Sequence, residues 1–159
     1  MQNTKNSKEV QGTGTAQEQM LFEFNSATKE LFTNFELDFI KPNYEVMIYG
    51  WIYSENCNAS FPNERADIYF FNRQFLEFLT EVSTGTSDVK TFINFVDGWD
   101  LESSIKRLFE VYDGYLHGED ADDKNIRINC IWLYDQLKIY FKTIYEIYQS
   151  HRAELKLTA

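Results

Sequence analysis

The stretch Asn125–Lys156, NIRINCIWLYDQLKIYFKTIYEIYQSHRAELK, decides the fold predicted for this chain. It belongs to the longest run without glycine or proline, and its apolar residues recur at steps of three and four, which keep side chains on one face of an α-helix. That face consists of Ile126, Cys130, Leu133, Leu137, Tyr140, Phe141, Ile144 and Tyr148. We therefore predict a long C-terminal helix that buries one side in a hydrophobic core.

Three apolar residues of the same stretch, Ile128, Trp132 and Ile139, lie on the other side of the predicted helix. Large apolar side chains that gather on one surface need something to cover them. The pattern allows two covers. Either a neighbouring helix of the same chain packs over these residues, or a partner protein or a second copy of the chain does.

The remainder of the chain is also predicted to be helical. Helical spacing recurs in a long segment that starts at Thr15 and stops at Pro42, and again over residues 62–82, 87–97 and 100–116. With 7 Gly and 2 Pro in 159 residues, the chain lacks the turn residues that an all-β protein needs. We predict an all-α fold, a compact bundle of five to six helices with a long C-terminal helix.

The predicted domain organisation is simple. Residues 1–14 are polar and cannot bury enough surface to offset the entropy of ordering, so a disordered N-terminal tail is expected there. Residues 15–159 are expected to form a single helical domain, because no shift in composition marks a second one. Residues 43–55 fit both a helix and a buried strand, and we interpret them as a helix because the chain offers no second strand for pairing.

The charge of the chain is negative and uneven. The formal net charge is -10. Residues 124–156 hold six basic and three acidic side chains, whereas residues 1–123 hold 9 basic and 22 acidic ones. Because phosphate backbones are bound mainly by Lys and Arg, direct nucleic-acid binding is disfavoured. The acidic part instead favours a basic protein partner.

Sequence signatures of catalysis are absent from the chain. There is no G-x-S-x-G nucleophile elbow, no H-E-x-x-H zinc motif and no glycine-rich phosphate loop. The two cysteines, Cys57 and Cys130, have no Cys or His at the spacing of a zinc site, and neither histidine, His117 or His151, has a recognisable catalytic companion. We therefore expect neither an enzyme nor a bound cofactor.

The acidic loop over residues 117–123 holds the only weak candidates for a metal site. Carboxylates and a histidine within seven residues resemble the ligand set of a hard cation. The EF-hand spacing fails, because its glycine and its final glutamate are both missing. We interpret the segment as a solvated loop before a helix N-terminus, where negative charge is favoured. The candidate ligands are His117, Glu119, Asp120 and Asp122.

Aromatic residues make up 17% of the chain, more than short helices can bury on one face each. Tyr49 and Tyr53 stand four residues apart, off the apolar face of their predicted helix. Exposed tyrosine and tryptophan are typical anchors of protein interfaces. Here they alternate with acidic residues, which favours a protein partner over single-stranded nucleic acid. The predicted partner-binding residues are Tyr49, Tyr53, Ile128, Trp132 and Ile139.

These features lead to three hypotheses about function. The leading one is a non-catalytic acidic protein-binding module, an inhibitor of the antitoxin or immunity-protein kind, that docks on a basic partner. The second is a structural subunit that forms a homodimer or larger homo-oligomer through the C-terminal helix. The third is a metal-dependent enzyme that uses the acidic loop.

The surroundings in which the chain works are also predicted. No stretch is apolar enough to span a membrane, and the N-terminus does not resemble a signal peptide, so we expect a cytoplasmic protein. The abundance of Asn, Lys, Ile, Phe and Tyr suits an AT-rich bacterial or phage genome.

Overall fold

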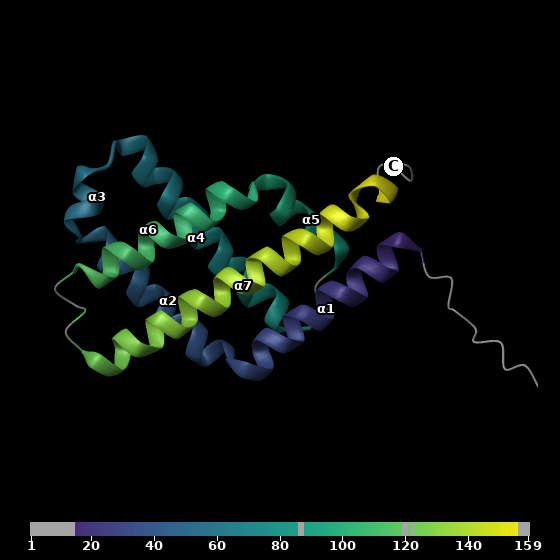
Figure 1. The fold of residues 1–159 in the computed structure, drawn as a ribbon, viewed down its shortest axis with the longest axis horizontal. Coiled ribbons are helices and arrows are strands. Elements are labelled where there is room, and N and C mark those ends of the chain that lie inside the picture. Colours follow the sequence, from purple (N-terminus) through teal and green to yellow (C-terminus); the bar gives the residue numbers. More distant parts are fainter. Residues whose placement is uncertain (1–14, 86–87, 119–120, 122, 156–159) are drawn as a thin grey trace, which may run out of the picture.

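Seven α-helices make up the part of the chain that the computed structural model describes, residues 15–85, 88–118, 121 and 123–155, and this part contains no strand (Figure 1). The predicted all-α class is therefore confirmed. The predicted disordered tail over residues 1–14 lies outside the described residues. The helices are α1 (Ala16–Asn34), α2 (Leu37–Ile52), α3 (Glu55–Ala59), α4 (Pro62–Ser83), α5 (Val89–Gly98), α6 (Leu101–Leu116) and α7 (Lys124–Leu155).

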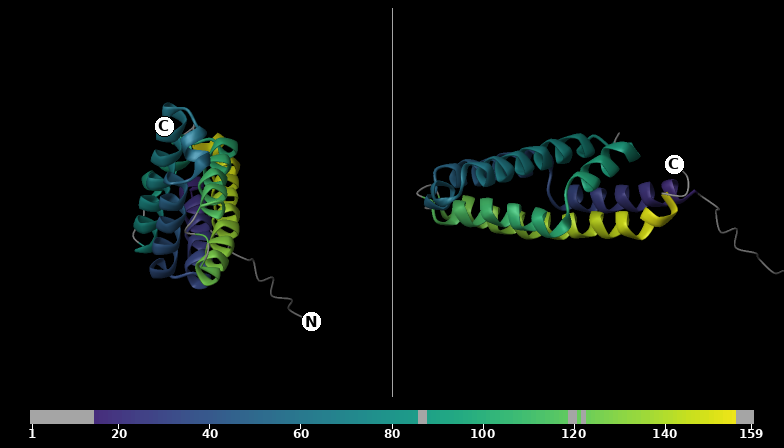
Figure 2. Two further views of the ribbon diagram at one scale, coloured as in Figure 1. Left: turned by 90° about the vertical axis from the view of Figure 1, so that its left-hand side faces the viewer. Right: turned by 90° about the horizontal axis from the view of Figure 1, so that it is seen from above.

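The long helix α7 crosses the whole molecule, with α6 beside its first half and α1 beside its second half (Figure 1). Seen from above, α4 runs along one long side of the molecule, and α6 and α7 run along the other (Figure 2). The core face predicted for α7 is buried, with Cys130, Leu133, Leu137 and Ile144 fully shielded from solvent. The sequence pattern thus identified the helix that organises the bundle.

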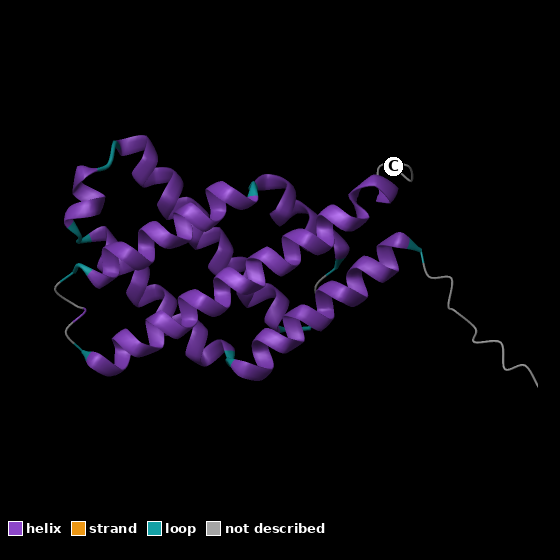
Figure 3. Cartoon of the chain, viewed as in Figure 1, coloured by secondary structure: helices purple, strands orange, loops and turns teal. Residues whose placement is uncertain are grey.

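The break between the first two helices is not where the sequence predicted it. Pro42 does not stop α1; it lies in the second turn of α2 and faces solvent. There it removes one backbone hydrogen bond, which a helix start tolerates better than a helix centre. The chain instead turns at Phe35 and Glu36, both of which adopt extended backbone angles (Figure 3).

The ambiguous segment 43–55 is helical, as α2 runs to Ile52 and the short helix α3 begins at Glu55. The side chain of Ser54 starts α3 by accepting a hydrogen bond from the backbone N–H of Cys57 at 3.2 Å. This single turn is the helix that raises the number above the predicted five to six.

The centre of the bundle is filled by stacked phenylalanines. Phe78 of α4 stacks on Phe95 of α5 with ring centroids 4.2 Å apart, and Phe24 of α1 stacks on Phe92 of α5 at 4.3 Å. Phe75 contacts both Phe95 and Phe141, so α4, α5 and α7 share one cluster. Large rings fill the space between helices efficiently, which explains where most of the aromatic residues are used.

Two glycines allow α2 and α6 to pack closely. A Cβ atom on Gly50 would lie 2.7 Å from Cδ2 of Tyr115, and one on Gly114 would lie 2.5 Å from Cδ1 of Trp51. Both distances are shorter than a van der Waals contact, so any larger residue would push the two helices apart. The close approach fixes how α2 lies on the bundle.

Candidate interaction surfaces

The five predicted partner-binding residues all lie at the surface, but on two separate helices. Tyr49 on α2 is 53% exposed, and Tyr53, the residue that follows α2, is 79% exposed. On α7, Ile128, Trp132 and Ile139 are 47%, 61% and 54% exposed. The described helices of the chain therefore leave Ile128, Trp132 and Ile139 about half exposed or more. The role of these five residues in binding stays a prediction.

The exposed apolar residues of α7 point away from α2. The Cys130 thiol of α7 donates to the backbone carbonyl of Asn43 in α2, with 3.6 Å between the sulfur and the oxygen, so this side of α7 faces α2. Trp132 follows two residues later, about 200° further round the helix, and so points away from α2. The structure therefore does not unite the five residues in one site.

A pair of side-chain contacts sets the register between α2 and α4. The Tyr44 hydroxyl donates to Oδ1 of Asn72 at 2.6 Å, and Glu45 forms an ion pair with Arg73 at 3.8 Å. In Figure 1, α2 runs from right to left and α4 from left to right, so the two helices that these contacts join are antiparallel. One turn further along α2 must then lie opposite one turn further back along α4.

This register puts Tyr49 of α2 and Tyr69 of α4 on the sides of their helices that carry the Glu45–Arg73 ion pair. Tyr49 follows Glu45 by four residues and Tyr69 precedes Arg73 by four, so each tyrosine stands on the same face of its helix as the ion pair. Tyr69 is 43% exposed. Together with Tyr53, the residue directly after α2, these residues form what we call the tyrosine face (Tyr49, Tyr53 and Tyr69).

Sequence reasoning did not single out Tyr69. A signal was present, because Tyr69 stands off the apolar stripe of its helix, which Ile68, Phe71 and Phe75 define. What the sequence could not supply was the register between α2 and α4, which depends on contacts between residues 28 positions apart.

The charges around the two surfaces differ in sign. Residues 37–83, which include α2 and α4, hold seven acidic and three basic side chains, a net charge of -4. In α7 the balance is reversed, with five basic and three acidic side chains. On the outer side of α7, Lys138 contacts Asp135 at 3.3 Å and lies over the ring of Tyr134. The segments that carry the two surfaces thus have net charges of opposite sign.

The acidic loop offers little for a metal ion in the part that the structure describes. His117 places Nδ1 2.9 Å from the backbone oxygen of Asp113. Asp123 accepts the backbone N–H groups of Asn125 and Ile126 at 2.8 and 3.2 Å, at the start of α7. Among the described residues, no three His, Cys, Asp or Glu side chains gather as a metal site would require. The other candidate ligands, Glu119, Asp120 and Asp122, lie outside these residues.

The two cysteines are poorly suited to nucleophilic chemistry. Both are buried free thiols. Burial raises the pKa of the Cys130 thiol to about 11 and also raises the pKa of Cys57. Because the thiolate is the reactive form, both groups stay protonated at neutral pH and pack as small apolar side chains.

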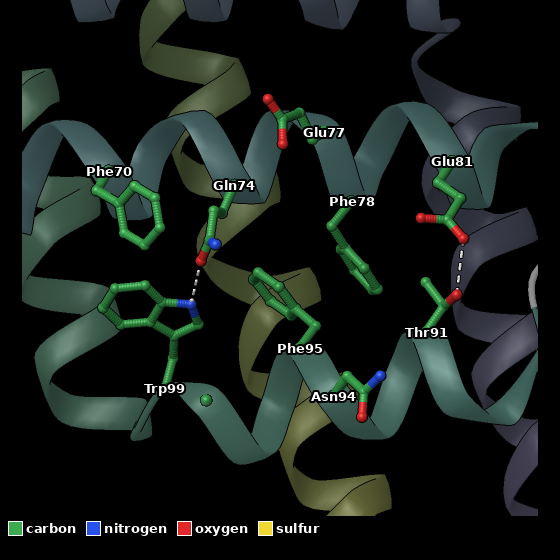
Figure 4. Close-up of a pocket in the computed structure, with 10 residues that line it drawn as sticks. Phe70, Gln74, Glu77, Phe78, Glu81, Thr91, Asn94, Phe95 and Trp99 are labelled. Carbon is green, nitrogen blue, oxygen red and sulfur yellow. Dashed lines mark hydrogen bonds between the residues drawn. The ribbon is translucent and has the colours of Figure 1, made fainter.

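A groove of about 650 Å³ lies between α4 and α5 (Figure 4). Two hydrogen bonds span it: Trp99 donates to Gln74 at 3.1 Å, and Thr91 donates to Glu81 at 2.7 Å. The Phe78–Phe95 stack lies between these bonds and belongs to the core, since both rings are almost fully buried. The groove is thus crossed by the contacts that hold α5 to α4.

Comparisons with known proteins give no relative for this chain: no family model, no curated protein and no solved structure matches it. None of the helices in the described ranges has an apolar stretch long enough to cross a membrane.

Proposed function

We propose that the chain is a protein-binding module without catalytic activity, and that it docks on a basic protein through the tyrosine face. The observation that carries this proposal is that Tyr49 and Tyr69 are exposed on the sides of α2 and α4 that carry the Glu45–Arg73 ion pair, with the more exposed Tyr53 just after the end of α2. Three tyrosines on two adjoining helices make a broader surface than any single helix could present.

Tyrosine suits such a role for a physical reason. Its ring gives much contact area while only two torsions must be ordered, and its hydroxyl can donate or accept a hydrogen bond at the edge of an interface. The helices that carry the rings are fixed by buried contacts, so little backbone ordering is needed on binding. A preformed surface of this kind is typical of inhibitors that bind a folded target.

Charge supports a basic partner. The segment 37–83 is net negative, and the whole chain carries -10. A positively charged target would be attracted over distances up to the Debye length, about 8 Å at physiological salt, which raises the association rate more than the final affinity. Of the nearby cations, Arg73 is already paired with Glu45.

The proposal is tested by recovering partners from cells that encode the chain. The wild-type chain and the double variant Tyr49→Ala/Tyr69→Ala would be immobilised side by side, with Phe22→Ala as the matched control. Phe22 is an aromatic residue of α1 that is 71% exposed. A basic protein retained by the wild type and the control but lost from the double variant, and released earlier at high salt, supports the proposal.

Two results would contradict it. If the same proteins are retained by the double variant, the tyrosine face is not the docking surface. If retention does not depend on ionic strength, the electrostatic part of the argument is wrong. Both variants replace exposed side chains, so neither is expected to unfold the chain.

A further inference from the structure

The exposed apolar residues of α7 follow the spacing of a coiled-coil seam. Ile128, Trp132, Asp135 and Ile139 are separated by four, three and four residues, which is the alternation of the two inward positions of a heptad. Trp132 and both isoleucines are about half exposed or more. We refer to these four residues as the α7 seam.

We propose that a second copy of the chain covers the α7 seam, with the two α7 helices packed antiparallel around a two-fold axis. The seam fits itself in this arrangement. In an antiparallel pair, each of the two inward heptad positions of one helix packs against the other kind of inward position on the partner helix. Ile128 therefore packs on the partner's Ile139, and Ile139 on the partner's Ile128. Trp132 then packs next to the partner's Asp135 on both sides of the axis.

The polar residue in the seam has a partner in this register. The indole N–H of Trp132 can only donate a hydrogen bond, and a carboxylate accepts one. Trp132 can therefore donate to the partner's Asp135. Two such hydrogen bonds form by symmetry. A polar pair of this kind fixes register and orientation rather than adding much affinity.

The net positive charge of α7 does not prevent this pairing. In the same register Lys138 lies opposite the partner's Ile131, and Lys142 lies opposite the partner's Asn125. No lysine of one copy therefore faces a lysine of the other along the seam. A symmetric pair also closes on itself, whereas docking the seam on the acidic side of another copy would generate open chains of molecules.

The size of the seam sets how strong the dimer is expected to be. A standard interface buries about 800 Å² on each partner, and three exposed apolar side chains supply only the centre of such an area. We therefore expect reversible dimerisation with a dissociation constant in the micromolar range.

Sedimentation equilibrium of the full chain, from low micromolar to submillimolar concentration, tests the pairing. We expect the wild type to move from the mass of one chain to twice that mass. The variant Trp132→Glu should weaken dimerisation by more than about tenfold, because both copies lose their central anchor. The variant Tyr49→Glu, which changes the tyrosine face, should dimerise like the wild type.

The same series contains the results that overturn the proposal. A monomer at every wild-type concentration removes it. A dimer that survives Trp132→Glu places the interface elsewhere. Loss of the dimer in Tyr49→Glu would mean that the seam docks on the tyrosine face of another copy, and would overturn the symmetric pairing.

Disulfide cross-linking tests the register, because the two native cysteines are buried. An equimolar mixture of the variants Ile128→Cys and Ile139→Cys should yield a disulfide-linked heterodimer under mild oxidation. Neither variant alone should cross-link to itself, since the two positions lie roughly 16 Å apart along the helix. Preferential self-cross-linking of Ile128→Cys would indicate a parallel pair and overturn the antiparallel register.

Discussion

The tyrosine face and the α7 seam are both exposed and partly apolar, yet they are built differently. The tyrosine face combines two helices, uses rings with polar tips, and lies in a segment of net negative charge. The α7 seam belongs to one helix, combines aliphatic side chains with a tryptophan, and lies in a segment of net positive charge. The first suits contact with a different protein, and the second suits contact with a copy of itself.

This difference shows that the spacing of exposed residues along a helix says more about their possible partner than their exposure alone. By exposure alone, both Tyr53 and Trp132 would count as candidate interface residues. The seam, however, repeats at a heptad interval along one helix, whereas the tyrosines acquire meaning only when α2 and α4 are placed in register by Tyr44 and Asn72. If the comparison is correct, changes to the scaffold beneath one surface should affect that surface more than the other.

The largest effect is expected from a substitution in the core, which supports both the tyrosine face and the α7 seam. Phe75→Ala removes a fully buried ring that contacts Phe71, Phe95 and Phe141, and should lower the free energy of unfolding by about 3–5 kcal/mol. Both binding activities should fall together. Denaturant unfolding measures the loss, with Phe22→Ala as the exposed control. A loss below about 1 kcal/mol would mean that this cluster is not the common core.

A substitution between α2 and α6 should have a smaller effect, and it should weaken binding at the tyrosine face more than at the α7 seam. Gly114→Ala places a Cβ 2.5 Å from Cδ1 and 3.2 Å from Cα of Trp51, so α2 must move away from α6 at a cost of about 1–3 kcal/mol. The tyrosine face lies partly on α2 and should bind less well, while dimerisation through α7 should change little. Gly98→Ala is the matched control, because its Cβ would meet nothing within 4 Å. Equal destabilisation by both variants would contradict the close packing of α2 on α6.

The smallest effect concerns the start of α6, which supports both surfaces without belonging to either. Asp100 caps this helix by accepting the N–H of Ser103 at 2.8 Å, and Asp100→Ala should cost about 1 kcal/mol at neutral pH. Dimerisation and partner binding should both stay at wild-type levels when the chain is folded.

The same cap should contribute to the pH dependence of stability. Hydrogen bonds from Ser103 hold the pKa of Asp100 below its ordinary value of 3.8. A carboxylate whose pKa is lower in the folded state stabilises the fold above the unfolded-state pKa, and this contribution disappears as the pH falls through the folded-state value. Asp100→Asn keeps a capping oxygen but does not titrate, so its free energy of unfolding should decrease less than that of the wild type between neutral and strongly acidic pH. Identical pH profiles would mean that the charge of the cap is screened.

The sequence predicted features that repeat within one helix and missed features that depend on contacts between helices. The core face of α7, from Cys130 to Ile144, was readable because one periodicity sets it. Pro42 was misread as a stop because a proline near a helix start looks the same in sequence as one beyond a helix end. Tyr69 was missed because its relation to Tyr49, twenty residues earlier, depends on how α4 packs on α2, which the Glu45–Arg73 ion pair shows and the sequence does not.

Photo-cross-linking at the tyrosine face tests most directly the claim that this chain works by docking on a basic protein. Benzoylphenylalanine would replace Tyr69 in one sample and Phe22 in another, both in cells that encode the chain, so that similar aromatic probes report on two surfaces. We expect one basic protein to be linked at position 69, with a yield that falls as salt is added to the extract, and not at position 22. No adduct at position 69, or the same adducts at both positions, would contradict the account.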